Sequence, residues 1–179
     1  MGKFYPTLNQ KLQDFTRRQK IFFVSTAPEK GRINISPKGY EAFRILNEGE
    51  VVFLNMVGSG NETAGHLLEN KRITIMFCSF ETEPMILKIY GQGRAIHPGE
   101  EGFAELIQLF PSLPGTRQLI HIQIESVQTS CGDGVPFFDF VGERSRLIEW
   151  AEEKGPEKVK DYQDKNNRLT IDGKTTGLP

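Results

Sequence analysis

Six stretches of the chain are rich in β-branched and aromatic residues, or alternate between apolar and polar side chains. Both patterns are typical of β-strands, in which successive side chains point to opposite faces. The clearest case is Gln118 to Thr129, where isoleucine recurs at every second position from Ile120 to Ile124. The six predicted strands are residues 21–26, 32–36, 51–56, 72–80, 85–96 and 118–129.

Helical periodicity occupies less of the chain, in short segments between and after these strands. The capping-box spacing of Thr7 and Gln10 predicts that a first helix begins there. Further helices are predicted after Thr63 and over residues 100–110, 143–154 and 156–165, with residues 166–179 as a loop or tail. Because strands outnumber short helices, the pattern favours a mainly β (α+β) fold, an antiparallel barrel closed on itself, over a parallel βαβ sheet.

The character of the sequence changes at residue 131, where a Gly- and Pro-containing loop precedes two helical stretches. A chain of 179 residues is long enough for one domain with a hydrophobic core. We therefore expect residues 1–130 to form the barrel domain and residues 131–179 to form a C-terminal helical extension.

Composition and charge exclude several functions. The net charge is −1 and no stripe of Lys and Arg stands out, which argues against a nucleic-acid binder. No apolar run reaches the roughly 18 residues of a membrane span, and the first nine residues lack the apolar core of a signal peptide. Cys78 and Cys131 belong to no CxxC motif or Cys/His cluster, so no metal site is expected. These features predict a cytoplasmic protein that binds neither membrane nor nucleic acid.

Three polar turns carry the candidate chemistry. The stretch from Asn34 to Gly39 offers an amide, a hydroxyl and an ammonium group, and Gly58 to Thr63 is a glycine-rich turn that leads into a helix N-terminus. Free backbone N–H groups and the helix dipole favour a phosphate at such a turn. An ordinary loop with Asn61 as helix cap is the alternative reading of the second turn. The third turn, Gly91 to Arg94, lies inside a strand and indicates a bend or a close backbone approach.

Two single side chains near these turns are candidates for ligand contact. Lys38 could anchor an anionic group, although an isolated lysine is most often a solvated charge. His66 follows Thr63 by one helical turn and could face the same cleft, or it could be an exposed or capped residue.

Taken in order, these motifs resemble the pyridoxamine 5'-phosphate oxidase-related family, which has the FMN-binding split-barrel fold. The resemblance covers roughly residues 8–129, and its specificity lies in the order of strands and turns. The segments that carry it are residues 32–39 (RINISPKG), 52–55 (VFLN), 58–63 (GSGNET), 72–77 (RITIMF) and 87–94 (LKIYGQGR).

The resemblance implies a split-barrel homodimer that holds FMN at the subunit interface, with the C-terminal extension on the same domain or on the partner. It also implies an FMN-dependent oxidoreductase acting on a small molecule, with no catalytic residue assigned. The alternatives are a non-enzymatic flavin carrier or sensor, and a split barrel that binds haem or a deazaflavin. The implied cofactor-binding residues are Arg32, Asn34, Ser36, Lys38, Phe53, Leu54, Ser59, Asn61, Glu62 and Thr63.

The sequence departs from the oxidases that give this family its name in two places. Those enzymes usually carry an adjacent Arg–Lys pair at the phosphate turn, where this chain has Asn61, Glu62 and Thr63. Their C-terminal Arg-and-His substrate signature is also missing. We therefore expect neutral donors and Lys38 to replace the basic pair, and a substrate other than pyridoxamine phosphate.

Overall fold

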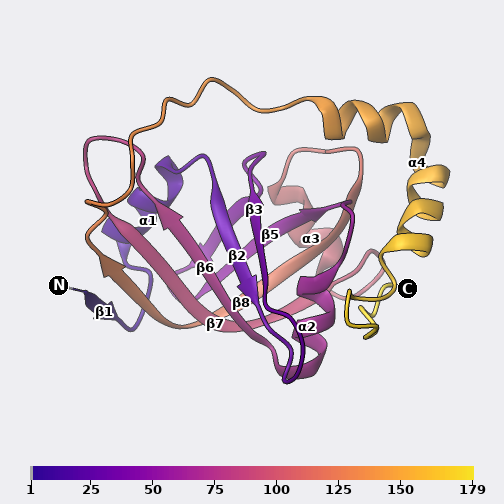
Figure 1. Cartoon of the computed structure of the whole chain (residues 1–179), viewed down its shortest axis with the longest axis horizontal. Coiled ribbons are helices and arrows are strands. Elements are labelled where there is room, and N and C mark those ends of the chain that lie inside the picture. The colour runs from indigo at the N-terminus through magenta and orange to yellow at the C-terminus, as the bar shows by residue number, and fades with distance from the viewer. Residues whose placement is uncertain (1) are drawn as a thin grey trace.

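The computed structural model describes residues 2–179 and is built around one antiparallel sheet (Figure 1). Its strands are β1 (Lys3–Tyr5), β2 (Phe22–Thr26), β3 (Asn34–Lys38), β4 (Phe43–Asn47), β5 (Glu50–Met56), β6 (Arg72–Cys78), β7 (Ile86–Ile96) and β8 (Thr116–Ser130). Its helices are α1 (Gln10–Arg18), α2 (Glu62–Asn70), α3 (Phe103–Leu106), a 3₁₀ turn at Ile107–Leu109, and α4 (Arg146–Asn166).

The sheet runs in the order β3-β2-β6-β7-β8-β5-β4, and β1 pairs with the far end of β8. The mainly β, split-barrel fold is therefore confirmed. Two details of the prediction were wrong: the sheet has eight strands instead of six, and it does not close on itself. The additional strands, β1 and β4, are short edge segments whose pairing depends on distant strands, so their local sequence pattern is weak.

Four phenylalanines fill the centre of the barrel. The Phe22 ring lies 5.3–5.7 Å, centroid to centroid, from the rings of Phe43, Phe53 and Phe77, and Phe43 lies 5.0 Å from Phe77, mostly edge to face. Such aromatic contacts add to the hydrophobic effect of burying the rings. The side chains of α1 close one end of this core, with Leu12 and Phe15 buried.

The helix boundaries differ slightly from those predicted. The N-cap of α1 is Asn9, whose Oδ1 accepts a hydrogen bond from the Leu12 amide, whereas Thr7 bonds to Glu48. The helix predicted over residues 100–110 shortens to α3 and the 3₁₀ turn. The two C-terminal helical stretches are merged in α4, which kinks at Gly155 (φ 71°) before Pro156. None of the described helices is long and apolar enough to cross a membrane.

The two glycines of β7 allow close packing of neighbouring elements. At Gly91 the register with β8 shifts, and a Cβ atom there would lie 2.2 Å from the Gln123 carbonyl oxygen. A Cβ on Gly93 would meet the Leu67 side chain of α2 at 3.1 Å. As the predicted close approach implied, glycine is required at both positions, because β8 packs directly on Gly91 and α2 packs directly on Gly93.

Residues 131–179 cross one end of the barrel and then descend along its far side as α4 (Figure 1). An extended segment crosses from β8 to α4, whose Ala151 and Val159 pack on Val57 in a small second core. Trp150 and Tyr162 lie edge to face on the same helix at 5.1 Å. The last residues then return to α2, so the C-terminal end lies beside the turn that follows β5.

Candidate functional site

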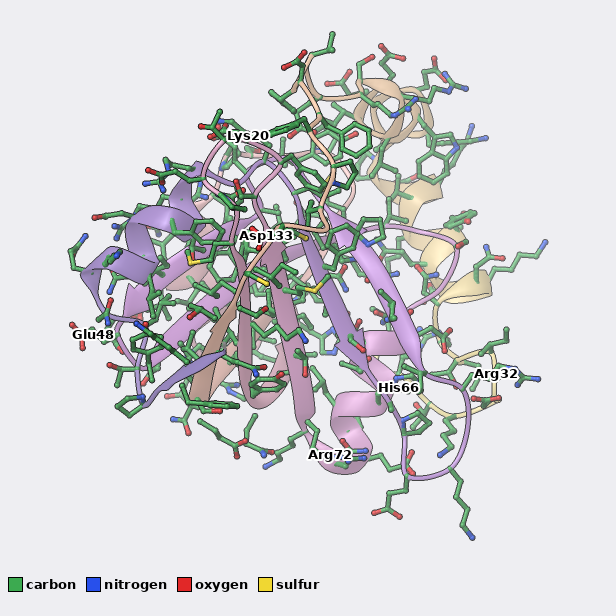
Figure 2. The ribbon with its side chains drawn as sticks, turned by 60° about the vertical axis from the view of Figure 1, so that its left-hand side comes forward. Lys20, Arg32, Glu48, His66, Arg72 and Asp133 are labelled. Atoms are coloured by element: carbon green, nitrogen blue, oxygen red, sulfur yellow. The ribbon has the colours of Figure 1, made fainter. Side chains whose placement is uncertain are left out.

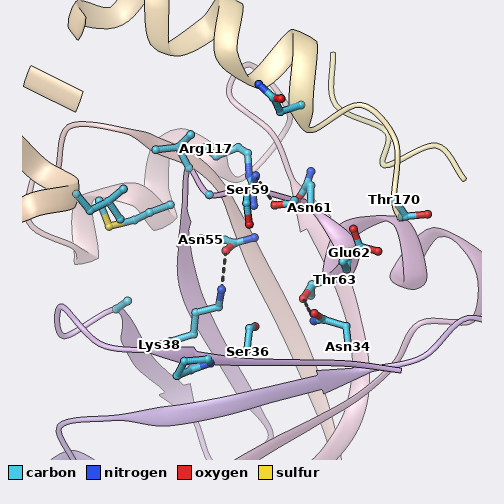
Figure 3. Close-up of a pocket in the computed structure, with 18 of the residues that line it drawn as sticks. Asn34, Ser36, Lys38, Asn55, Ser59, Asn61, Glu62, Thr63, Arg117 and Thr170 are labelled. Atoms are coloured by element: carbon cyan, nitrogen blue, oxygen red, sulfur yellow. Dashed lines mark hydrogen bonds between the residues drawn. The ribbon is translucent and has the colours of Figure 1, made fainter. Parts of the chain in front are cut away.

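A pocket of about 750 Å³ lies between β3, the end of β5, the N-terminus of α2 and the C-terminal residues. Figure 3 shows three side chains of β3 pointing across it toward the turn after β5. The pocket is lined by all but one of the predicted site residues: Arg32, Asn34, Ser36, Lys38, Leu54, Ser59, Asn61, Glu62 and Thr63. The first two predicted polar turns therefore meet in space.

Strand alternation places the polar side chains of β3 on one face. Asn34, Ser36 and Lys38 are two positions apart, so all three point into the pocket. The Lys38 ammonium donates to Asn55 Oδ1 at 3.2 Å, and the Asn34 amide donates to Thr63 Oγ1 at 3.3 Å. Between them, the buried Ser36 hydroxyl has no hydrogen-bond partner among the described residues.

The turn after β5 leads into the N-terminus of α2. Asn61 stands at the N-cap position, but its side chain makes no capping bond within residues 2–179. Instead, Asn61 and Gln118 exchange amide hydrogen bonds of 2.9 and 3.3 Å. The Asn61 side chain thus leaves the N-terminus of α2, which borders the pocket, without a cap, and a helix N-terminus favours an anion.

Arg117, at the start of β8, is a pocket residue that the sequence reasoning missed. Its side chain is only 4% exposed and donates to the Gly60 carbonyl at 3.0 Å and to Asn167 Oδ1 at 2.7 Å. Its Nε is buried without a partner among the described residues. Burial lowers the pKa of this guanidinium to about 10, so it remains charged at neutral pH.

Lys38 and Arg117 together make the pocket positive. Burial, and secondarily the charge of Arg117, lowers the pKa of the Lys38 ammonium to about 8. In the part of the chain that the structure describes, no carboxylate lies within 4 Å of either cation. Two half-buried or buried cations without counter-ions are costly unless an anion joins them, so the pocket is suited to an anionic ligand.

Glu62 does not face these cations. Both of its carboxylate oxygens accept from the backbone N–H of Ile171, at 3.1 and 3.2 Å. The residues predicted to be a loop or tail are thus ordered against α2, with Asn167 and Thr176 fully buried. The Glu62 charge is held toward the C-terminal residues, which lessens its repulsion of an anion beside Arg117.

Phe53 is the predicted site residue that lies elsewhere. Its ring is fully buried in the aromatic core beside Phe22, on the opposite face of β5 from the pocket. The next residue, Leu54, lines the pocket instead. Both faces of β5 are buried, so the sequence pattern could not tell which face borders the site.

The third predicted turn and His66 also lie outside the pocket. Gln92 on β7 bonds to Glu125 of β8, and Arg94 is exposed. His66 is a buried residue of α2 that faces β2, where its Nδ1 lies 3.0 Å from Thr26 Oγ1. Figure 2 shows His66 on α2. The prediction that three turns converge was therefore right for two turns and wrong for the third.

Sequence comparison places the chain in a family. The sequence model described as pyridoxamine 5'-phosphate oxidase matches residues 8–131. The Aspergillus flavus pyridoxamine 5'-phosphate oxidase family protein ustO is 37% identical in an alignment 193 positions long, which covers 97% of this chain and 77% of that protein. The chain belongs to the pyridoxamine 5'-phosphate oxidase family, as the resemblance implied.

Solved structures share the fold at low sequence identity. HupZ of Group A Streptococcus has a TM-score of 0.53 at 20% identity, covering 66% of this chain and 90% of that one. The FAD-binding protein of Mycobacterium smegmatis has a TM-score of 0.51 at 14% identity, covering 70% and 97%. At such identities the likeness establishes the split-barrel fold alone.

Proposed function

We propose that the pocket binds FMN and that the protein is an FMN-dependent oxidoreductase acting on a small molecule. One observation carries this proposal: within residues 2–179, Ser36 Oγ and Arg117 Nε are buried without hydrogen-bond partners, and the cations Lys38 and Arg117 have no counter-ion. Buried polar atoms are almost always paired, so these atoms indicate a ligand with acceptor oxygens. Membership of this family, and a structural neighbour that binds FAD, support a flavin as that ligand.

The residues of the pocket fit a ribityl phosphate. Arg117, the Ser59 and Thr63 hydroxyls and the N-terminus of α2 would hold the phosphate. The Ser36 hydroxyl and the Asn34 amide would meet the ribityl hydroxyls along β3. The related oxidases carry an Arg–Lys pair at the phosphate turn. In this chain Arg117, from another strand, would supply a guanidinium in place of that pair.

When bound, FMN supplies the redox chemistry, accepting a hydride or electrons from the substrate. The protein binds and orients the cofactor and keeps water from it. Lys38, held by Asn55, would place a positive charge where negative charge develops on the flavin. A carrier or sensor needs the same binding residues but no substrate site.

We also propose that the protein is a homodimer with the pocket at the interface. Ile35 on the edge strand β3 and Ile33 just before that strand have exposed fractions of 68% and 72%, and Ile33 borders the pocket. Exposed apolar residues on an edge strand are usually covered in an assembly. Light scattering should give twice the 20.3 kDa chain mass, whereas a monomer at micromolar concentration would contradict this proposal.

Titration of the apoprotein with FMN, followed by flavin fluorescence, tests the binding proposal. Saturable binding of one FMN per chain is expected, with riboflavin bound more weakly because it lacks the phosphate. Reduction of the bound flavin by NADH or NADPH, followed by its reoxidation in repeated catalytic cycles, supports an oxidoreductase. Tight binding with no reduction by a broad panel of donors would favour the carrier, and no binding would exclude both.

The pKa of Lys38 predicts how FMN affinity depends on pH. Lys38 is protonated below pH 8 and neutral above it, and an anion bound nearby favours the protonated form. Raising the pH from about 7 to about 9 should therefore weaken FMN binding by about tenfold, because binding then requires uptake of one proton. In Lys38→Met the affinity should be lower and nearly independent of pH over this range. If the FMN affinity of the wild type depended on pH as little as that of the variant, Lys38 would not contact the bound FMN.

A further inference from the structure

A second cavity, of about 480 Å³, adjoins the candidate cofactor pocket. Lys38, Gly39 and Tyr40 line both cavities, which therefore meet at the end of β3. Its volume is in the range of small-molecule sites. In the proposed arrangement the phosphate lies beside Arg117 and the flavin ring lies toward Lys38. The second cavity is then next to the ring, where a substrate has to bind.

The outer wall of this cavity belongs to residues 137–144, here called the aromatic segment. Three of its phenylalanines are exposed: Phe137 (76%), Phe138 (65%) and Phe140 (55%). Phe138 and Phe140 line the second cavity, whereas Phe137 does not. Phe138 also meets Phe80 edge to face at 5.5 Å, and Phe80 lines the same cavity. Three phenylalanine rings therefore border one cavity at the surface of the protein.

Hydrogen bonds to the barrel hold the aromatic segment in place. Near its start, the Phe138 amide donates to the Phe80 carbonyl at 3.2 Å. At its end, the Tyr40 hydroxyl donates to the Arg144 carbonyl, and the Glu143 carboxylate accepts from the Tyr40 amide at 3.0 Å. These bonds connect the segment to the residues that follow β6 and β3, which fixes its phenylalanines at the cavity.

The anchor at Tyr40 has a strained backbone. Tyr40 and Glu41 have φ angles of 58° and 50°, in the left-handed region that residues other than glycine rarely adopt. Two consecutive residues of this kind cost free energy, and such strain is concentrated at functional sites. The bonds from Tyr40 to Glu143 and Arg144 offset part of that cost and keep Tyr40 between the two cavities.

The charges around the second cavity have both signs. Lys20 and Arg144 are cations, and Glu81 and Asp139 are carboxylates. Lys20, labelled in Figure 2, lies over the Phe140 ring, 5.8 Å from its centroid. Because mixed charge selects neither an acid nor a base, the rings determine which molecule fits. Phenylalanine rings favour a planar aromatic partner through edge-to-face and offset contacts.

We infer that the second cavity is the substrate site and that it takes a neutral aromatic molecule. Phe80, Phe138 and Phe140 then contact the ring system of the substrate and hold it beside the flavin. The inference rests on the proposed function, since it assigns the substrate of the same cofactor. It also gives a function to Phe138 and Phe140, whose apolar surface otherwise faces water.

Equilibrium dialysis of the FMN-loaded protein tests the inference, with coumarin as the probe and its saturated analogue octahydrocoumarin for comparison. Coumarin should bind saturably and about tenfold more tightly than the saturated analogue, because only the aromatic probe makes ring-to-ring contacts. The double variant Phe138→Ala/Phe140→Ala should bind coumarin about tenfold more weakly, while its FMN affinity changes by less than about threefold. Phe137→Ala is the matched control and should bind coumarin like the wild type.

A leucine variant separates aromatic contact from apolar contact. Phe138→Leu/Phe140→Leu keeps an apolar wall without its rings, so the preference for coumarin over octahydrocoumarin should disappear. The exposed positions of both residues make unfolding an unlikely cause, and the unchanged FMN affinity of each variant verifies that it is folded. A preference for coumarin that survives in the leucine variant would overturn the aromatic selectivity.

The flavin spectrum tests whether the probe lies beside the cofactor. Coumarin bound in the second cavity should shift the absorption bands of the bound FMN, because the two cavities meet at Lys38. An unchanged flavin spectrum at saturating coumarin would overturn the substrate role. Competition between coumarin and FMN would place the flavin ring itself in this cavity and would also overturn it.

Light scattering distinguishes a substrate site from an interface between copies of the chain. The double alanine variant should have the same mass as the wild type, and a lower mass would show that Phe138 and Phe140 contact a second copy. That result, or FMN binding without saturable coumarin binding, would overturn the inference and leave the proposed function standing. Failure of the protein to bind FMN would overturn both.

Discussion

Replacement of Arg117 by methionine is expected to weaken FMN binding by about a hundredfold, since a charge-assisted hydrogen bond contributes roughly 1.5–3 kcal/mol. Arg117 is the buried cation nearest the turn that would hold the phosphate, through its contact with the Gly60 carbonyl. The loss should be much smaller for riboflavin, which has no phosphate. Flavin fluorescence titration measures both affinities.

Two further variants separate a phosphate role for Arg117 from a purely structural one. Arg117→Lys keeps the charge and should recover part of the FMN affinity, whereas Arg94→Met removes an exposed arginine outside the pocket and should change nothing. Arg117→Met also leaves the Gly60 carbonyl and Asn167 without their donor, so a stability loss of about 1–3 kcal/mol is expected. If riboflavin and FMN affinities fall equally, Arg117 does not contact the phosphate.

Replacement of Phe53 by alanine is expected to lower the free energy of unfolding by about 3–5 kcal/mol. The ring is fully buried against Phe22 and opposite Phe43 in the β4–β5 pair, so its removal leaves a cavity in the barrel core. The FMN affinity of the folded protein should not change, because the ring faces away from the pocket. Denaturant unfolding and FMN titration give the two quantities.

The leucine variant serves as the control for Phe53. Phe53→Leu keeps most of the buried volume and should cost less than about 1.5 kcal/mol. The resemblance to the family had implied that Phe53 borders the flavin ring. A shifted flavin spectrum in Phe53→Ala without a large loss of stability would support that placement against the one described here.

The strands were predictable because their pattern is local. Isoleucine alternates from Ile120 to Ile124 in β8, and the β-branched run of β6 needs no tertiary information to be identified. The polar face of β3 follows from the same rule, since Asn34, Ser36 and Lys38 are two residues apart. Alternation over the predicted strand 32–36 placed Asn34 and Ser36 on one face, whereas Lys38 and the assignment of this face to the site came from the resemblance to the family.

The opposite wall depends on contacts between residues far apart in the sequence. Arg117 is the second residue of β8, whose next residues are buried on both faces, so periodicity does not distinguish it from a surface charge. Its partner Asn167 lies 50 positions away in residues predicted to be a tail. The only local signals were a charged residue beside a buried strand and several polar residues after a helix, and both are common on surfaces.

Phe53 and Gly91 show two further limits of the sequence. Every interior residue of β5 is buried, so the hydrophobic pattern could not assign Phe53 to the core and Leu54 to the pocket. At Gly91 the requirement for glycine was recognised, but its cause is the Gln123 carbonyl on the neighbouring strand and not a ligand. A glycine in the sequence indicates that another group lies close to the backbone, but it does not indicate which group.

The absorption spectrum of the purified protein, with identification of the released chromophore, tests the central claim most directly. The account predicts bands at about 370 and 450 nm from a bound flavin, released on denaturation as FMN. A spectrum with a Soret band would indicate haem, and a released deazaflavin would indicate a different cofactor. Either result, or a colourless protein that takes up no added FMN, would contradict the assignment of this pocket.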